Sequence, residues 1–178
     1  QEISLQGGML NNIALCLDLG NPSVSNVFNN NDVVFVTDDE GNYYIPGNNV
    51  NTIENIQNKN GYQVLLAGQN NQTLIAEGYP LDFTETPITL EPFTLNNMPY
   101  LPSEVTTAED FAHNLPVVFC SDDEGHYFIP SAGVNTIDSS GGMKPGKGYQ
   151  VLISGTESIE FVYGEPNGAG LGLSLIHI

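Results

Sequence analysis

The sequence predicts an all-β protein made of two tandem homologous modules, each a β-sandwich or barrel-like unit that is β-rich with one short helix. Composition is the first observation. The chain has 19 glycines and 11 prolines in 178 residues, and these residues interrupt long helices but suit tight turns between short strands. Apolar residues form 40% of the chain and gather in runs of strand length, which is the second observation. The third is an internal repeat, and it sets the module boundaries.

The repeat is clearest between residues 33–53 and 117–137, where 14 of 21 positions are identical at an offset of 84. Shorter matches flank this segment: Leu-Asn-Asn at 10–12 and 95–97, and Gly-Tyr-Gln-Val-Leu at 61–65 and 148–152. The predicted organisation is a first β-module over 1–80, a connector over 81–92 spaced by prolines, and a second β-module over 93–178.

The elements of the first module can be predicted in chain order. They are a strand at 33–37, an acidic turn at 38–41, a returning strand at 42–45 that Pro46 ends, a central strand at 62–67 and another strand at 73–79. A capping box over Thr106–Glu109 predicts a helix over 110–115 of the second module. Residues 23–30 form its weaker counterpart in the first.

The ends of the chain carry two expectations. The chain begins at Gln1, so we expect a processed product or a fragment whose start follows a removed secretory signal. The segment Leu173–Ile178 resembles the translation of a sequencing adaptor, as occurs in metagenomic assemblies. The alternative is a genuine strand, because Leu171, Leu173 and Leu175 alternate with Gly172 and Ser174.

The charge of the chain excludes two classes of partner. The formal net charge is −18, arginine is absent, and the only lysines are Lys59, Lys144 and Lys147. Nucleic acids and anionic membrane surfaces both require a basic face. No apolar run approaches the ~20 residues that span a bilayer. We therefore expect neither nucleic-acid binding nor membrane insertion.

The acidic turns are the candidate metal sites. Asp38, Asp39 and Glu40 return as Asp122, Asp123 and Glu124, and each trio precedes a glycine. Clustered carboxylates suit calcium, but the EF-hand spacing is absent. Asp and Gly are equally what a tight hairpin turn requires. The plain hairpin is the preferred interpretation, and calcium is the alternative.

Catalytic motifs are scarce, so we expect no enzyme. Residues 141–148 nearly match a phosphate-binding loop, but Gly148 stands where a hydroxyl is needed and a strand follows instead of a helix. No nucleophile elbow and no Cys-x-x-Cys pair occurs. Cys16 and Cys120 align with Leu101 and Val36 of the other copy, which favours free buried thiols over a bridge.

Aromatic side chains provide a different option, the stacking of sugars. Tyr43, Tyr44, Tyr62, Tyr79, Tyr127, Phe128 and Tyr149 are the candidates. Most of them lie among apolar neighbours and repeat in both copies, which favours core packing. Asn71 begins a glycosylation sequon, Asn71-Gln72-Thr73.

Taken together, the repeated motifs resemble a tandem module of secreted, surface-associated proteins from bacteria with type IX secretion. The shared pattern is an Asp-rich turn with Gly, an aromatic-Ile-Pro step, Asn-Thr-Ile and then Gly-Tyr-Gln-Val, and both copies carry it. The resemblance covers nearly the whole chain. It implies an extracellular or cell-surface location more than any chemistry.

These features lead us to expect an extracellular structural protein, the repeating subunit of a filament or pilus-like fibril. Copies of the chain would assemble through exchange of terminal β-strands between subunits. The expected subunit-interface residues are Ile3, Leu5, Leu171, Leu173 and Leu175. The alternative is a carbohydrate-binding or calcium-dependent adhesion module of a bacterial surface protein, with glycans as partners.

Overall fold

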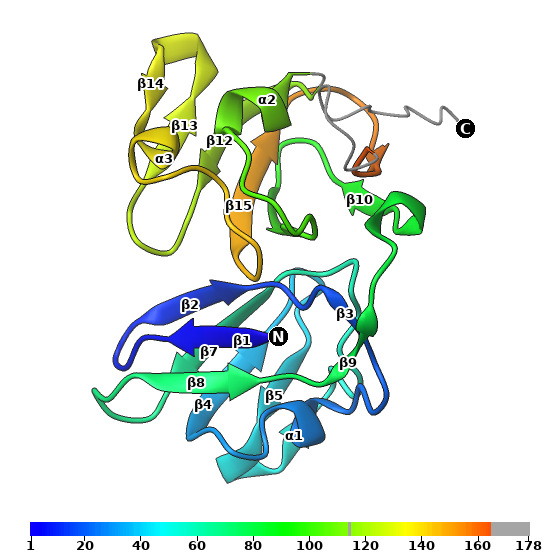
Figure 1. Cartoon of the computed structure of the whole chain (residues 1–178), viewed down its shortest axis with the longest axis vertical. Helices are drawn as coiled ribbons and strands as arrows, with labels where there is room; N and C mark the ends of the chain where they lie inside the picture. Colours follow the sequence, from blue (N-terminus) through cyan, green and yellow to red (C-terminus); the bar gives the residue numbers. More distant parts are fainter. Residues whose placement is uncertain (114, 165–178) are drawn as a thin grey trace.

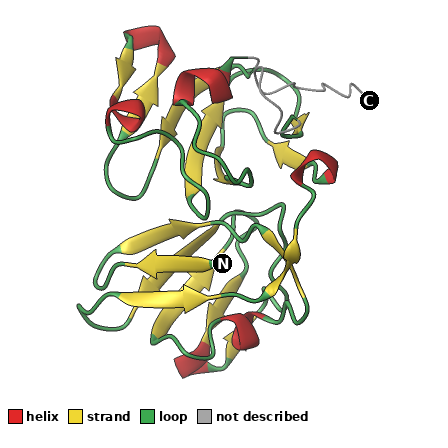
Figure 2. Ribbon diagram, in the orientation of Figure 1, coloured by secondary structure: helices red, strands yellow, loops and turns green. Residues whose placement is uncertain are grey.

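The structure, a computed structural model, describes residues 1–113 and 115–164. It consists of two strand-rich modules stacked along the long axis of the molecule (Figure 1). Strands dominate both modules, and the helices of the described part are single short turns (Figure 2). The predicted all-β class is confirmed. None of the described helices is both long and apolar enough to cross a membrane.

The first module is built on a five-stranded antiparallel sheet with the order β2-β7-β4-β5-β6. Its strands are β2 (Leu10–Ile13), β4 (Val33–Thr37), β5 (Tyr43–Ile45), β6 (Val50–Asn51) and β7 (Tyr62–Leu66). Two two-stranded sheets accompany it: β1 (Glu2–Leu5) with β8 (Gln72–Ile75), and β3 (Leu17–Leu19) with β9 (Gly78–Pro80). The helical turns are α1 (Val24–Val27) and η1 (Pro46–Asn48).

The second module repeats this plan in the order β11-β15-β12-β13-β14. Its strands are β11 (Leu95–Pro99), β12 (Val117–Ser121), β13 (Tyr127–Ile129), β14 (Val134–Asn135) and β15 (Gly148–Ile153), with the pair β10 (Ile88–Leu90) and β16 (Ile159–Phe161). The helical turns are η2 (Phe83–Glu85), α2 (Ala108–Ala112), η3 (Pro130–Ala132) and α3 (Thr136–Ser139).

The two copies agree in register as well as in strand order. Leu10 lies opposite Leu65 in the first module, and Leu95 lies opposite Leu152 in the second. The same register shift follows the first residue of β4 and of β12. Matched sequence spacing therefore produces matched pairing, because a slip of one residue would turn every buried side chain outward.

Each module has its own core on one face of its five-stranded sheet. In the first module, Ile3 and Leu5 of β1 share a core with Tyr62, Val64 and the helix α1. The second core holds β10, α2 and the equivalent β15 residues. Each module is thus sandwich-like, with a two-stranded sheet and a short helix covering an open five-stranded sheet.

A buried asparagine organises the start of each module. Asn11 is 3% exposed, and its carboxamide bonds the backbone of Gln6, Met9 and Val64. Asn96 makes the equivalent bonds with Glu91, Thr94 and Val151 in the second copy. A buried amide with all its partners fixes the turn that joins the first two strands of the module.

The structure differs from the sequence-based expectations at several boundaries. The segment 81–92 contains β10, whose Ile88 and Leu90 lie in the second core, so much of the expected connector belongs to that module. The expected strand at 73–79 divides into β8 and β9. The helix cap is Thr107, whose hydroxyl accepts from the Asp110 N–H, one residue later than the expected capping box. The helix α3 was not expected.

Candidate functional site

Both acidic turns are closed by their first aspartate. Asp38 Oδ1 accepts the backbone N–H groups of Glu40 and Asn42, each at 2.9 Å. Asp122 Oδ1 accepts from Glu124 and His126, again at 2.9 Å. These carboxylates therefore act first as acceptors for the backbone of the turn, as the hairpin interpretation requires.

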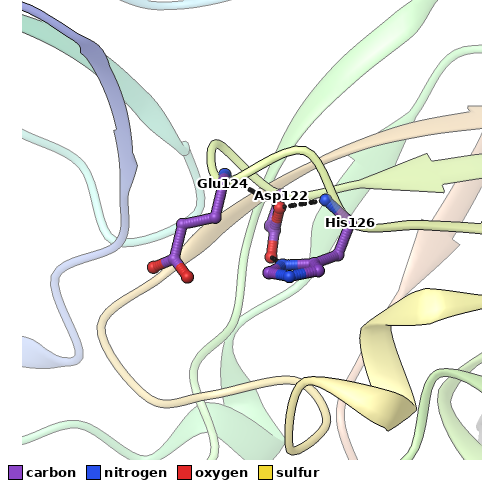
Figure 3. A group of neighbouring side chains, drawn as sticks. All are labelled: Asp122, Glu124 and His126. Atoms are coloured by element: carbon purple, nitrogen blue, oxygen red, sulfur yellow. Dashed lines mark hydrogen bonds and ion pairs between the residues drawn. The ribbon is translucent and has the colours of Figure 1, made fainter.

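The second module adds a histidine to this turn, and the group Asp122, Glu124 and His126 has the composition of a metal site. One candidate ligand atom from each residue lies within 4.8 Å of the others (Figure 3). His126 Nδ1 lies 2.7 Å from Asp122 Oδ2. In the first module, Asn42 Nδ2 donates to Asp38 Oδ2 at 3.0 Å in the same place. His126 thus stands where the other copy has an amide donor.

A lysine already pairs with two of the three acidic residues of this turn. Lys147 Nζ lies 2.8 Å from Asp123 Oδ1 and 2.9 Å from Glu124 Oε1. The ammonium lowers the pKa of Glu124. A cation such as calcium would have to displace Lys147 and the turn N–H groups before it reached the same oxygens. Calcium binding here stays a prediction, and the geometry gives it little support.

The second aspartate of each turn reaches into the other module. The backbone N–H of Asn12 donates to Asp123 Oδ2 at 2.9 Å, and that of Asn97 donates to Asp39 Oδ2. Asn12 and Asn97 occupy equivalent positions of the repeat, as do Asp39 and Asp123. The two contacts are therefore reciprocal, and the modules face each other across an approximate two-fold axis.

The glycine of each Gly-Tyr-Gln-Val motif lies at this interface. Gly61 donates its backbone N–H to Asn97 O at 2.8 Å, and a Cβ on Gly61 would collide with that carbonyl. A Cβ on Gly148 would lie 3.0 Å from the oxygen of Ile13. The opposing backbone approaches too closely for a side chain, which explains glycine at both positions.

The two halves of the interface differ in one charged residue. Asn60 takes the place of Lys147 in the first module, since both precede the motif glycine. Asp39 consequently has no equivalent of the Lys147 ion pair among the described residues. Loss of solvent at the interface raises the pKa of Asp39 to about 6, the Asn97 N–H opposes this effect, and the charges of Asp38 and Glu40 add to it.

The remaining motif residues hold their own module together. The Thr52 hydroxyl accepts from the Tyr43 N–H and donates to its carbonyl, and Thr136 does the same with Tyr127. The hydroxyls of Tyr62 and Tyr149 accept backbone N–H groups at 2.8 Å. Burial raises the pKa of Tyr62 to about 12. The repeated motifs thus describe an architecture rather than a reaction centre.

Another concave surface lies elsewhere in the first module. A cleft of about 730 Å³ opens between α1 and the segment that joins β8 to β9. Its lining includes Asn21, Asn26, Asn29 and Asn30, together with Glu77 and Tyr79. The Tyr79 side chain is 76% exposed. Of these residues, only Tyr79 was a candidate from the sequence, because the fold brings the asparagines together with it.

The other residues predicted to be functional have mixed placements. Ile3 is 7% exposed and Leu5 fully buried, both within their own module. Leu171, Leu173 and Leu175 lie outside the described residues. Asn71 is exposed and accepts the Gly7 N–H. Cys16 and Cys120 are free thiols, and only Cys120 is fully buried. Of the candidate sugar platforms, Tyr43, Tyr79 and Tyr127 are exposed, whereas Tyr62, Phe128 and Tyr149 are buried.

Comparisons with protein-family models, with curated proteins and with solved structures each return no match.

Proposed function

We propose that this chain is an extracellular structural protein, the repeating subunit of a filament or pilus-like fibril, assembled by exchange of β-strands between copies. The acidic surface, the two-module plan and the structural use of the repeated motifs support this proposal. The residues of those motifs bond the backbone of their own chain and leave little chemistry for a substrate.

The intermodule interface cannot itself extend a filament. Its contacts are reciprocal, from Asn12 to Asp123 and from Asn97 to Asp39. An interface that uses the same patch on both partners closes after one pairing. Growth must therefore use a different element, and that element must fit a site on the next copy.

The observation that carries the proposal is the position of β1. We call this position, beside β8 and over the core, the β1 slot. Among the described strands, β1 pairs only with β8, in a two-stranded sheet, and it places Ile3 and Leu5 in the core. In the second module, β10 fills the same slot with Ile88 and Leu90, paired with β16. The same pattern, Ile-x-Leu, therefore fills equivalent positions in the two modules. The β1 strand of a neighbouring copy has this pattern too, so it could fill the position in place of the chain's own β1.

The energetics of β1 favour exchange. Burial of two aliphatic side chains contributes about 1.5–3 kcal/mol each. Ordering four residues costs about 1–2 kcal/mol each. These quantities nearly cancel, so the attachment of β1 to its own module depends on its hydrogen bonds to β8 and on those of Gln1. Docking into a neighbour satisfies the same backbone groups and buries the same side chains, so the concentration of the protein decides between the two states.

The uncharged outer face of each sheet is compatible with close packing of copies. Leu10, Phe35 and Leu65 lie opposite one another on the outward face of the first sheet, and Leu95, Phe119 and Leu152 repeat them. Two chains that each carry a net charge of −18 repel one another. They can approach most closely where carboxylates are absent.

The experiment that tests this function is electron microscopy of the purified chain by negative stain, with sedimentation after dilution. We expect polymers that persist on dilution. Leu5→Asp places a charge in the slot and should abolish them, whereas Ser4→Asp, on the outward side of β1, should not. Monomers at every concentration of the unaltered chain would refute the proposed function.

A further inference from the structure

We propose that the cleft beside α1 binds a neutral oligosaccharide. The cleft is formed where three parts of the first module meet: the end of β3, the residues around α1, and the segment from Ile75 to Tyr79. Its volume of about 730 Å³ falls in the range typical of ligand-binding clefts. The cleft lining includes neither Ile3 nor Leu5, but it borders β1, because Ile75 is the Cα partner of Glu2 and Ala76 bonds Gln1.

The charge of the lining selects against anionic ligands. Among the residues that the structure describes, Glu77 is the one charged residue in the lining of the cleft, and no lysine lines it. Phosphates, sulfates and carboxylates would meet a chain of net charge −18 without a cation to receive them. The cleft therefore suits a ligand without negative charge.

The amides select for hydroxyl groups. Asn21, Asn26, Asn29 and Asn30 each carry one acceptor oxygen and an NH₂ group with two donors. A sugar hydroxyl both donates and accepts, so closely spaced carboxamides match a polyhydroxylated ligand better than a ligand with acceptors alone. Two of these amides are partly engaged: Asn21 Oδ1 accepts from the Ser23 N–H at 3.2 Å, and Asn26 Nδ2 donates to the Asn21 carbonyl at 3.4 Å.

Apolar surface completes the site. Val27 and Ala76 lie at 8% and 6% exposure in the lining, and the Tyr79 ring stands exposed beside them. A pyranose ring has an apolar C–H face and a hydroxyl-rich edge. An aromatic ring can pack against the C–H face, while amides and the Glu77 carboxylate form hydrogen bonds with the hydroxyl groups. An exposed aromatic residue next to four amides is the juxtaposition that points to a glycan.

The test is calorimetric titration of the chain with maltotetraose, cellotetraose and N,N′,N″,N‴-tetraacetylchitotetraose. At least one of these probes should bind saturably with millimolar or tighter affinity. Tyr79→Ala should weaken that binding at least fivefold, and Asn30→Ala at least threefold. Both side chains are exposed, so the melting temperature should stay unchanged.

Phe93→Ala is the matched control. Phe93 is 74% exposed, almost as much as Tyr79, but it lies in the second module and outside the cleft. Its removal should leave binding intact. The proposal is overturned if none of the three probes binds, or if Tyr79→Ala and Phe93→Ala bind equally well. Electron microscopy of Tyr79→Ala should still show polymers, so the failure of glycan binding and the failure of assembly are separate outcomes.

Discussion

At the scale of single residues, the repeated motif is explained by contacts that sequence alone does not reveal. The glycine that precedes each Tyr-Gln-Val looks like part of a turn. In the structure, Gly61 and Gly148 instead permit close approach of the opposing module's backbone. The second aspartate of each acidic turn gives no sign of a partner in the sequence, yet the exposed Asp39 and the half-buried Asp123 accept N–H groups from the other module.

Replacement of Gly61 by alanine tests the close approach. The new methyl group would collide with the Asn97 carbonyl, and relief of the clash requires the modules to shift apart. We expect a loss of about 1–3 kcal/mol in the free energy of unfolding. Gly47→Ala is the control, because a methyl there meets no described atom within 4 Å. Urea unfolding of both variants measures the difference; equal stability of the two would show that the contact is unimportant.

The pKa of Asp39 predicts a specific pH dependence. A folded-state pKa of about 6 lies above the unfolded value of about 3.9. The stabilising contribution of Asp39 is therefore fully present below about pH 3.9 and is lost as the pH rises through 6. Relative to Asp39→Asn, the unaltered chain should become more stable as the pH falls from 7.5 to 4.5. Solvent screening should keep this change below about 1 kcal/mol.

Glu124 should show the opposite pH dependence of stability, which checks the direction expected for Asp39. Lys147 lowers its pKa, so the contribution of Glu124 is present above the usual carboxyl range and is lost in acid. Glu124→Gln should therefore cost a small amount of stability at pH 7 and little below pH 4. Parallel urea titrations of both variants at several pH values measure the two dependences. The same direction of pH dependence at both sites would contradict this account of the interface.

At the scale of elements, hydrogen bonds from the backbone hold both acidic turns, and Lys147 adds ion pairs in the second. The oxygens of Asp122 accept the turn N–H groups and the His126 ring, and Glu124 pairs with Lys147. The sequence could not separate a hairpin from a calcium site here. The deciding partners are backbone N–H groups and a lysine 23 residues further along the chain.

A chelator therefore should not destabilise the protein. We expect melting temperatures in 2 mM calcium and in excess EDTA to agree within about 1 °C, because the carboxylates already have partners. Differential scanning calorimetry makes the comparison. A drop of several degrees in EDTA that calcium reverses would instead establish the adhesion module given as the alternative.

At the scale of the whole molecule, the internal repeat made much of the fold predictable. Val33–Thr37 was predicted with its observed bounds, and Tyr62–Leu66 within one residue. Apolar periodicity determines such strands locally. The second-module strand β10 was missed because the prolines around it indicated a connector, and burial of Ile88 and Leu90 depends on β16, some 70 residues later.

The candidate sites were less predictable than the fold, because they too depend on residues that are distant in the sequence. The intermodule hydrogen bond from Asn12 to Asp123 joins residues 111 positions apart. The cleft combines α1 with the segment that joins β8 to β9. No local pattern encodes either arrangement. The placement of β1 was anticipated as an exchanged strand, and the structure pairs it with β8 of the same chain.

Disulfide trapping of β1 tests the central claim, strand exchange, most directly. Ser4 and Thr73 are Cα partners across β1 and β8, and both side chains point away from the core. We would introduce Ser4→Cys and Thr73→Cys into a chain carrying Cys16→Ala and Cys120→Val, and oxidise it after assembly. Thr89→Cys with Glu160→Cys, the equivalent pair across β10 and β16, is the control and should link within one chain. Strand exchange predicts a ladder of covalent multimers for the first pair on a non-reducing gel; only intrachain links from assembled polymers would contradict it.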